Sequence, residues 1–177
     1  SHMGLFKISG DKALDLIQRV TSNDATVLVN GKAQYSYLPN EKGGIVDDII
    51  TYKVSDTEYL MVVNASNIDK DFEWINSQNT MNATFEDLSD QYSLLAIQGP
   101  KACDLLKDIG TSELPPFFSI KKDKVCGIEA WISRTGYTGE DGAEVLIKNK
   151  HAVTVWNTLL EKGQKYGVKP IGLGARD

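Results

Sequence analysis

Three consecutive runs of β-branched, aliphatic and aromatic residues constrain the fold most strongly, at residues 34–38, 45–54 and 58–63. Runs of this kind are typical of β-strands. A cluster of turn-forming residues at 39–44 separates the first two runs, and a turn at Ser55-Asp56 separates the second from the third. Because the links are so short, the three strands are predicted to form an antiparallel meander.

The rest of the chain alternates between strand-like and helix-like patterns. Strands are expected at residues 3–9, 83–88, 93–97 and 142–148, and in a hairpin over 120–137. Helices are expected at residues 11–20 and 66–76, from Gly99-Pro100 onward, and at 150–166. In the last of these helices, the residues expected to face inward are Val153, Trp156, Leu159 and Leu160. This order predicts an α+β fold of ferredoxin-like units, with antiparallel sheets covered by helices. The length of 177 residues fits one region, 1–177, that can divide into two interlocked subdomains at about 1–90 and 91–177.

Composition narrows the classes of partner and chemistry. A net charge of -5 gives no electrostatic support for a nucleic-acid partner. The sequence contains no run of eighteen apolar residues, so no membrane span is predicted. The two cysteines lack CxxC spacing, which favours free thiols in a reducing cytoplasm. With two histidines in the chain, no metal site is expected, and any chemistry must rest on carboxylates, Tyr, Lys and Arg.

The strand at residues 45–54 contains the strongest candidate for chemistry. Alternation along a strand places Asp48 on one face with Val46, Ile50, Tyr52 and Val54, and Asp47 on the other face with Ile45, Ile49, Thr51 and Lys53. The first face is the more apolar, so Asp48 is expected to be buried or to line a cleft, and Asp47 to face away. A buried carboxylate is costly unless it is bonded or has a chemical role. Asp48 is therefore a candidate for proton transfer, or else a structural residue that caps a backbone group or pairs with a Lys or Arg.

Aromatic and amide side chains surround this candidate in the expected sheet. Tyr35 and Tyr37 share a face of the preceding strand, where they can form an apolar wall for a flat heteroaromatic ligand, with Asp48 as the anchoring acid. The alternative is ordinary strand packing, which is more common for Tyr. Asn64 ends the third strand of the meander and can contact a ligand or cap the next helix.

A second cluster of candidate residues lies at 133–144, where three glycines surround two acidic residues in a tight turn. Glu144 shares a strand face with Leu146, which places it on a partly buried side. A Glu carboxylate can accept two parallel hydrogen bonds from an amine and a ring N–H. The same position also suits a surface strand residue.

Five sequence blocks occur together, in an order typical of one family. They are Ser1-His2-Met3-Gly4, Tyr35, Gly44-Ile45-Val46-Asp47-Asp48, Arg134-Thr135-Gly136-Tyr137-Thr138-Gly139-Glu140-Asp141-Gly142 and Gly174-Ala175-Arg176-Asp177. In these blocks the chain resembles the aminomethyltransferases, the T-proteins of the glycine cleavage system, from its first residue to its last. The block at 134–142 is the longest and the most diagnostic.

The resemblance implies an enzyme. The family transfers an aminomethyl group from the lipoyl arm of the H-protein to tetrahydrofolate, giving methylenetetrahydrofolate and ammonia. It implies tetrahydrofolate as cofactor and the lipoylated H-protein as partner. By this resemblance, Asp48 matches the catalytic aspartate, Glu144 the pterin-anchoring carboxylate and Arg176 a folate contact. The aromatic pocket positions are matched by Tyr35, Tyr52 and Tyr137, and further pocket positions by Met3 and Asn64.

The chain also departs from the family. Family members begin with a further segment and continue past Ala-Arg-Asp into a C-terminal barrel-like domain, so the resemblance implies a fragment that binds folate weakly and is inactive alone. The alternatives are a folate-binding regulator or repair relative, in which a Cys-rich motif would replace residues 134–142, and a folate-dependent demethylase. By resemblance, the compartment is the bacterial cytoplasm, or the mitochondrial matrix in a eukaryote.

Overall fold

The computed structural model describes residues 2–175, which divide into two compact units. The first consists of Met3–Asp90 with Phe118–Ile120, and the second of His2, Gln91–Phe117 and the residues from Lys121 onward. Each unit has its own sheet and its own hydrophobic core, so each is described by itself.

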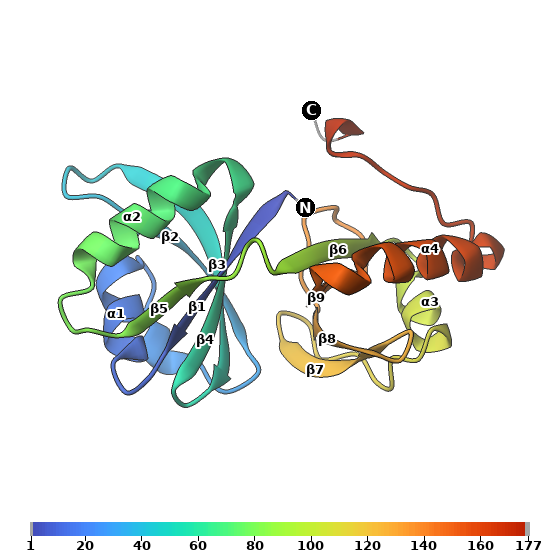
Figure 1. Ribbon diagram of the computed structural model, residues 1–177, viewed down its shortest axis with the longest axis horizontal. Coiled ribbons are helices and arrows are strands. Elements are labelled where there is room, and N and C mark those ends of the chain that lie inside the picture. The colour runs from blue at the N-terminus through green and yellow to red at the C-terminus, as the bar shows by residue number, and fades with distance from the viewer. Residues whose placement is uncertain (1, 176–177) are drawn as a thin grey trace. The chain divides into compact units, whose positions relative to one another are not determined.

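The first unit is built on a five-stranded antiparallel sheet (Figure 1). Its elements are β1 (Met3–Ser9), α1 (Ala13–Val20), η1 (Ala25–Val27), β2 (Ala33–Pro39), β3 (Ile45–Ser55), β4 (Glu58–Asn64), η2 (Ala65–Asn67), α2 (Ile68–Gln78) and β5 (Thr84–Asp87). The strand order is β2-β3-β4-β1-β5. The part β5-β1-β4-β3, with α1 and α2 as crossovers, is a ferredoxin-like β-α-β-β-α-β unit, and β2 extends it by one strand.

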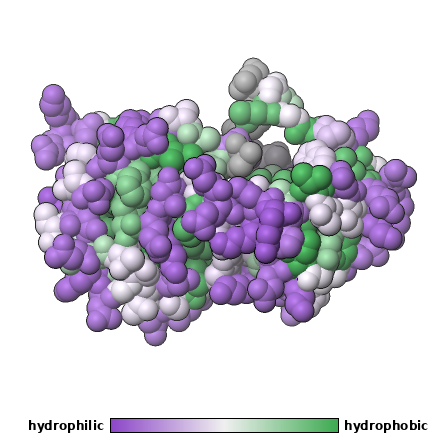
Figure 2. All heavy atoms as spheres, viewed as in Figure 1, coloured by the Kyte–Doolittle hydropathy of each residue, from purple (hydrophilic) through white to green (hydrophobic). Residues whose placement is uncertain are grey.

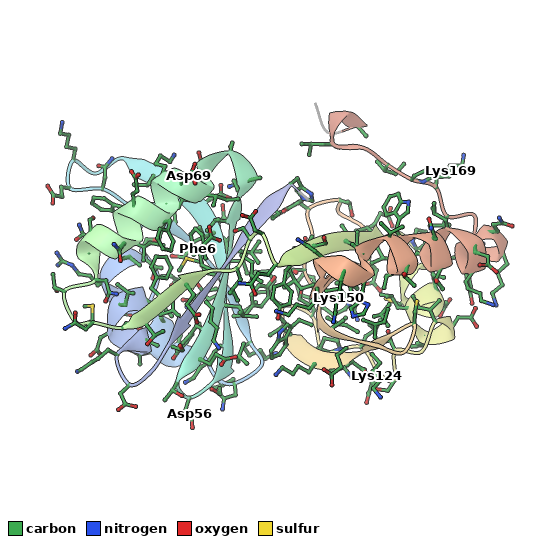
Figure 3. The ribbon with its side chains drawn as sticks, in the orientation of Figure 1. Phe6, Asp56, Asp69, Lys124, Lys150 and Lys169 are labelled. Carbon is green, nitrogen blue, oxygen red and sulfur yellow. The ribbon has the colours of Figure 1, made fainter. Side chains whose placement is uncertain are left out.

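The core of this unit lies between one sheet face and the two helices, α1 and α2 (Figure 1). The apolar stripe of α1 is buried at Ala13, Leu16, Ile17 and Val20, as its 3.6-residue period predicts. Phe6 of β1 is fully buried (Figure 3) and meets the rings of Phe72 and Phe85 edge-on. The Phe72 and Phe85 rings stack at 4.7 Å between centroids, which fixes α2 against the sheet.

The second unit has a four-stranded antiparallel sheet. Its elements are β6 (Tyr92–Gln98), α3 (Ala102–Asp108), β7 (Ile120–Val125), β8 (Ile128–Ser133), β9 (Gly142–Lys148), η3 (Asn149–His151), α4 (Ala152–Gly163), η4 (Gln164–Tyr166) and η5 (Leu173–Ala175). The strand order β6-β9-β8-β7 repeats the order β1-β4-β3-β2 of the first unit. The second unit thus repeats this part of the first without a sequence repeat, although its described residues include no counterpart of β5. The predicted α+β class with ferredoxin-like units is confirmed.

The prediction for the last helix is wrong in part. Leu159 is buried and Leu160 is partly buried as predicted, but Val153 and Trp156 are exposed (72% and 40%). Val155 and Gly163 are buried instead. A side chain at Gly163 would collide with Val168, so the chain packs closely where this helix ends. Apolar residues occur on both sides of α4, so periodicity alone did not separate the buried residues from the exposed ones.

Hydrophilic residues cover most of the face seen in Figure 2. Among the described residues, Cys103 and Cys126 are free and partly buried. Over the same residues, no helix reaches the length and apolar character needed to cross a bilayer.

Candidate functional site

Strand pairing in the first unit places five of the predicted site residues on one sheet face. Met3 of β1 pairs with Asn64 of β4, Val62 of β4 pairs with Ile50 of β3, and Ile50 pairs with Tyr35 of β2. Directly opposed residues share a face, as do residues two apart on one strand. The face that includes Met3, Tyr35, Asp48, Tyr52 and Asn64 is the one turned away from α1 and α2.

Asp48 is held on this face by two donors. The Tyr35 hydroxyl donates to Oδ2 at 3.0 Å, and the Asn64 Nδ2 group donates to Oδ1 at 3.1 Å. Asp48 itself is exposed, as are Tyr35 (53%) and Tyr37 (41%) on the neighbouring strand. The hydrogen bond to Asp48 raises the pKa of Tyr35, with smaller contributions from burial and from the charges of Asp48 and Asp47.

The predicted orientation of the two aspartates is wrong. Asp47 is buried (5% exposed) and Asp48 is exposed. The helices cover the face that carries Asp47, Ile49 and Thr51. The opposite face is apolar too, with Tyr52 1% exposed, so a count of apolar residues per face does not identify the side against which the helices pack.

Asp47 is a hydrogen-bonded structural acid at the end of the sheet. It accepts from the Asn64 backbone N–H at 3.0 Å, from Asn64 Nδ2 at 2.9 Å and from Asn67 Nδ2 at 2.6 Å. Burial by itself would raise its pKa. Hydrogen bonds from Asp71, Asn64 and Asn67 outweigh burial and lower that pKa.

Asp71 was missed by the sequence reasoning. It lies in the first turn of α2 and is fully buried, beside Asp47. In the first turn of a helix, an acidic residue is commonly a surface residue whose negative charge interacts favourably with the helix dipole. Its spacing of three residues after Ile68 and four before Ile75 places it on the apolar stripe, and this signal could have identified it.

Glu144 lies inside the second unit. It is 3% exposed, and it pairs with Ser133 of β8 on one side and Ala96 of β6 on the other. The Thr135 hydroxyl donates to Oε2 and lies 2.8 Å from the Ser133 hydroxyl. Burial raises the pKa of Glu144, and the Thr135 hydrogen bond offsets this only in part.

The loop before β9 borders a small cavity of about 230 Å³ in the second unit. It is lined by Gln98, Phe117, Arg134, Thr135, Gly136, Gly139, Glu140, Asp141 and Gly142. Arg134 and Asp141 form an ion pair across the loop. The cavity is smaller than the roughly 300–1,000 Å³ of typical ligand pockets, so by itself it is too small for a pteridine with its side chain.

Backbone contact explains one glycine of this loop. A Cβ on Gly142 would press against the Ile97 carbonyl oxygen and come within 2.8 Å of the Gln98 Cα. Tyr137, in the same loop, is 42% exposed, and its ring meets His2 edge-on at 6.2 Å between centroids. Arg176, the remaining predicted contact, lies outside the described residues.

The two groups of residues have different chemical capacities. On the first unit, a carboxylate fixed by a phenol and an amide is open at the surface, where it can accept a hydrogen bond from a ligand amine. On the second, a buried carboxylate with one hydroxyl donor can accept from N–H groups. Among residues 2–175, no cluster of three potential metal ligands is found.

Comparison with known proteins gives the family. The model of the GCVT N-terminal domain matches residues 1–177. The aminomethyltransferase of Flavobacterium psychrophilum is 52% identical over 180 residues, and that of Bacteroides fragilis is 47% identical over 181. Each alignment covers all of this chain and 50% of the relative, so the chain spans about half the length of these relatives.

Solved structures agree on the fold. The crystal structure of glycine cleavage system aminomethyltransferase T from Bartonella henselae matches with a TM-score of 0.88 at 33% identity, over 100% of this chain and 47% of that one. A heterotetrameric sarcosine oxidase from Corynebacterium sp. U-96 matches with a TM-score of 0.66 at 14% identity, over 97% and 85%, which shows a shared fold alone.

The chain is an α+β protein of two units, each with an antiparallel sheet. It belongs to the GCVT N-terminal domain family.

Proposed function

We propose that this chain forms the folate-binding part of an aminomethyltransferase of glycine cleavage. The enzyme transfers an aminomethyl group from the lipoyl arm of the H-protein to tetrahydrofolate, with release of ammonia. The observation that carries the proposal is the match to aminomethyltransferases over the whole chain, at up to 52% identity in the relatives compared. Since the chain spans half of those relatives, the activity is proposed for a protein that contains both halves.

Two features of the chain fit tetrahydrofolate as the bound group. Exposed aromatic rings flank the Asp48 carboxylate on one sheet face, as a flat heteroaromatic ligand requires. The Thr135 hydroxyl donates to Oε2 of the buried Glu144 carboxylate, which has further lone pairs that can accept from a ligand N–H. Bound tetrahydrofolate would supply the nitrogens that accept the one-carbon unit.

The roles of the side chains follow from their chemistry. Asp48 orients the reacting amine through a hydrogen bond and accepts or returns a proton as ammonia leaves. Tyr35 and Asn64 hold that carboxylate in one orientation, so that less freedom is lost when the reactants meet. Tyr137 and Met3 provide apolar contact, and Tyr52 is the buried aromatic residue of the face that carries Asp48 (1% exposed). Glu144 anchors the pterin edge, and Arg176 contacts folate.

The experiment is an ammonia-release assay with aminomethylated H-protein and the full-length gene product, with and without tetrahydrofolate. We expect release to depend on tetrahydrofolate and to be lost in Asp48→Asn. Asp56→Asn is the matched control, because Asp56 is an exposed aspartate at the turn after β3. Release by Asp48→Asn at the rate of the parent would refute the assignment of Asp48, and an absence of release in the parent would refute the proposed activity.

A further inference from the structure

Asp71 has an unusual environment for a carboxyl group. Its side chain is fully buried, and no N–H or hydroxyl group of the described residues donates to either of its oxygens. The carboxyl group of Asp47 lies next to it, close enough for a side-chain hydrogen bond. Two carboxylates cannot hydrogen-bond to each other unless one of them carries a proton.

The hydrogen bonds of the two acids show which of them is protonated. Asp47 accepts three N–H bonds, two from Asn64 and one from Asn67, and these favour its ionised form. Asp71 has no such donor among the described residues, so it is the acid that keeps its proton. Burial, and after it the hydrogen bond and charge of Asp47, raise the pKa of Asp71 to about 8.

Other charged groups near α2 do not change this assignment. Lys70, on the same helix, lowers the pKa of Asp71, but its ammonium donates to the Val46 carbonyl at 2.6 Å. The charge of Asp48 on β3 raises that pKa further. From α1, Arg19 donates instead to Gln78 at 3.2 Å, and from β4, Glu58 pairs with Lys7 at 3.1 Å.

Asn64 connects this buried pair to the exposed site. Its Nδ2 group lies 2.9 Å from Oδ1 of Asp47, 3.1 Å from Oδ1 of Asp48 and 3.3 Å from the Asp48 carbonyl oxygen. The orientation of this one amide is therefore set on the buried side by Asp47, and it presents its second hydrogen to Asp48.

We propose that Asp71 is a positioning residue: its protonated carboxyl group donates to Asp47, which fixes the Asn64 amide that holds Asp48. The statement about Asp48 as the reacting acid rests on the proposed function, whereas the chain of hydrogen bonds does not. When Asp71 loses its proton, two carboxylates face each other in the core, and Asp47 moves away from its fixed position.

NMR of the 177-residue chain tests the hydrogen bonds without any activity. With carboxyl-¹³C-labelled aspartate, we expect one aspartate to titrate at about pH 8. The Asn64 side-chain amide signal should shift with the same midpoint. Both transitions should be absent in Asp71→Asn, which keeps a neutral donor, and unchanged in Asp69→Asn, an exposed acid on the same helix (Figure 3). Titration of every aspartate in the acidic range, or an Asn64 amide that does not respond, would overturn the proposal.

Kinetics of the full-length gene product test the consequence for the reaction. In the parent, kcat should fall above about pH 8. Asp71→Asn should retain activity beyond that pH. Asp71→Leu, which keeps a branched side chain but removes the donor, should lower kcat roughly tenfold or more with little change in KM. A folded Asp71→Leu variant with the kcat of the parent would contradict the positioning role. If the parent has no transferase activity, the proposed function is refuted. The NMR titration then tests by itself whether the hydrogen bonds from Asp71 through Asp47 to Asn64 form.

Discussion

The Tyr35 hydroxyl donates to the Asp48 carboxylate at 3.0 Å, diagonally across two neighbouring strands, since Tyr35 is directly opposite Ile50. This bond joins an exposed aromatic ring to the exposed acid that we propose for catalysis. It also predicts a measurable electrostatic coupling, because a phenol that donates to a carboxylate resists ionisation.

The first prediction concerns this coupling. Asp48→Asn should lower the pKa of Tyr35 toward its ordinary value, since the substitution removes the charged acceptor that raises it. Tyrosinate absorbance measured against pH detects the change, and Tyr35→Phe identifies the transition that belongs to this residue among the seven tyrosines. An identical tyrosinate curve for Asp48→Asn and the parent would show that the bond does not form in solution.

The second prediction separates the two adjacent aspartates. Asp48→Asn should change the free energy of unfolding by no more than about 0.5 kcal/mol, because Asp48 is exposed. Asp47→Asn should cost about 1–3 kcal/mol, because an amide cannot accept all three N–H bonds and presents a donor to donors. Urea unfolding of both variants beside the parent measures the difference. Equal losses of stability would show that the burial of Asp47 is not maintained in solution.

The third prediction is a pH dependence of stability due to Asp71. In the unfolded chain this acid titrates near 3.8, and in the folded chain at about 8. Below the lower value both states are protonated, and the contribution of Asp71 to stability is fully present. As the pH rises, the unfolded chain releases its proton first, so this contribution falls until the pH passes the folded pKa.

Urea unfolding across that pH range tests the third prediction. The free energy of unfolding of the parent, minus that of Asp71→Asn, should decrease steadily between the two pKa values and then become constant. Asp69→Asn, on the same helix but exposed, should give a constant difference. A constant difference for Asp71→Asn as well would mean that Asp71 is ionised in the folded state at neutral pH.

The fourth prediction concerns Glu144. Glu144→Gln should weaken binding of tetrahydrofolate roughly tenfold or more, since a hydrogen bond to a charged group contributes about 1.5–3 kcal/mol and the amide replaces an acceptor with a donor. Isothermal titration measures the affinity. Glu129→Gln, an exposed acid on β8 of the same unit, is the control. Equal affinities of Glu144→Gln and the parent would remove Glu144 from the ligand site.

Local pattern determined most of the secondary structure. The meander of β2, β3 and β4 follows from three apolar runs with short links. The strand predicted at residues 3–9 corresponds to β1, and the helix predicted at residues 11–20 corresponds to α1. The same alternation shows that Asp47 and Asp48 point to opposite faces of β3. These features depend on residues close together in the chain, so the sequence alone predicts them.

Tertiary structure decided which faces are covered. Both faces of β3 carry apolar residues, so only the packing of α1 and α2 determined that Asp47 is buried and Asp48 exposed. The same packing turned Asp71 inward and placed it against Asp47, which lies 24 positions away in the sequence. The protonation of a buried acid depends on the donors and charges that folding brings to it, and most of these are distant in the chain. For this reason the sequence identified the acid pair on β3, whereas the hydrogen-bond chain through Asp71, Asp47 and Asn64 became visible only in the fold.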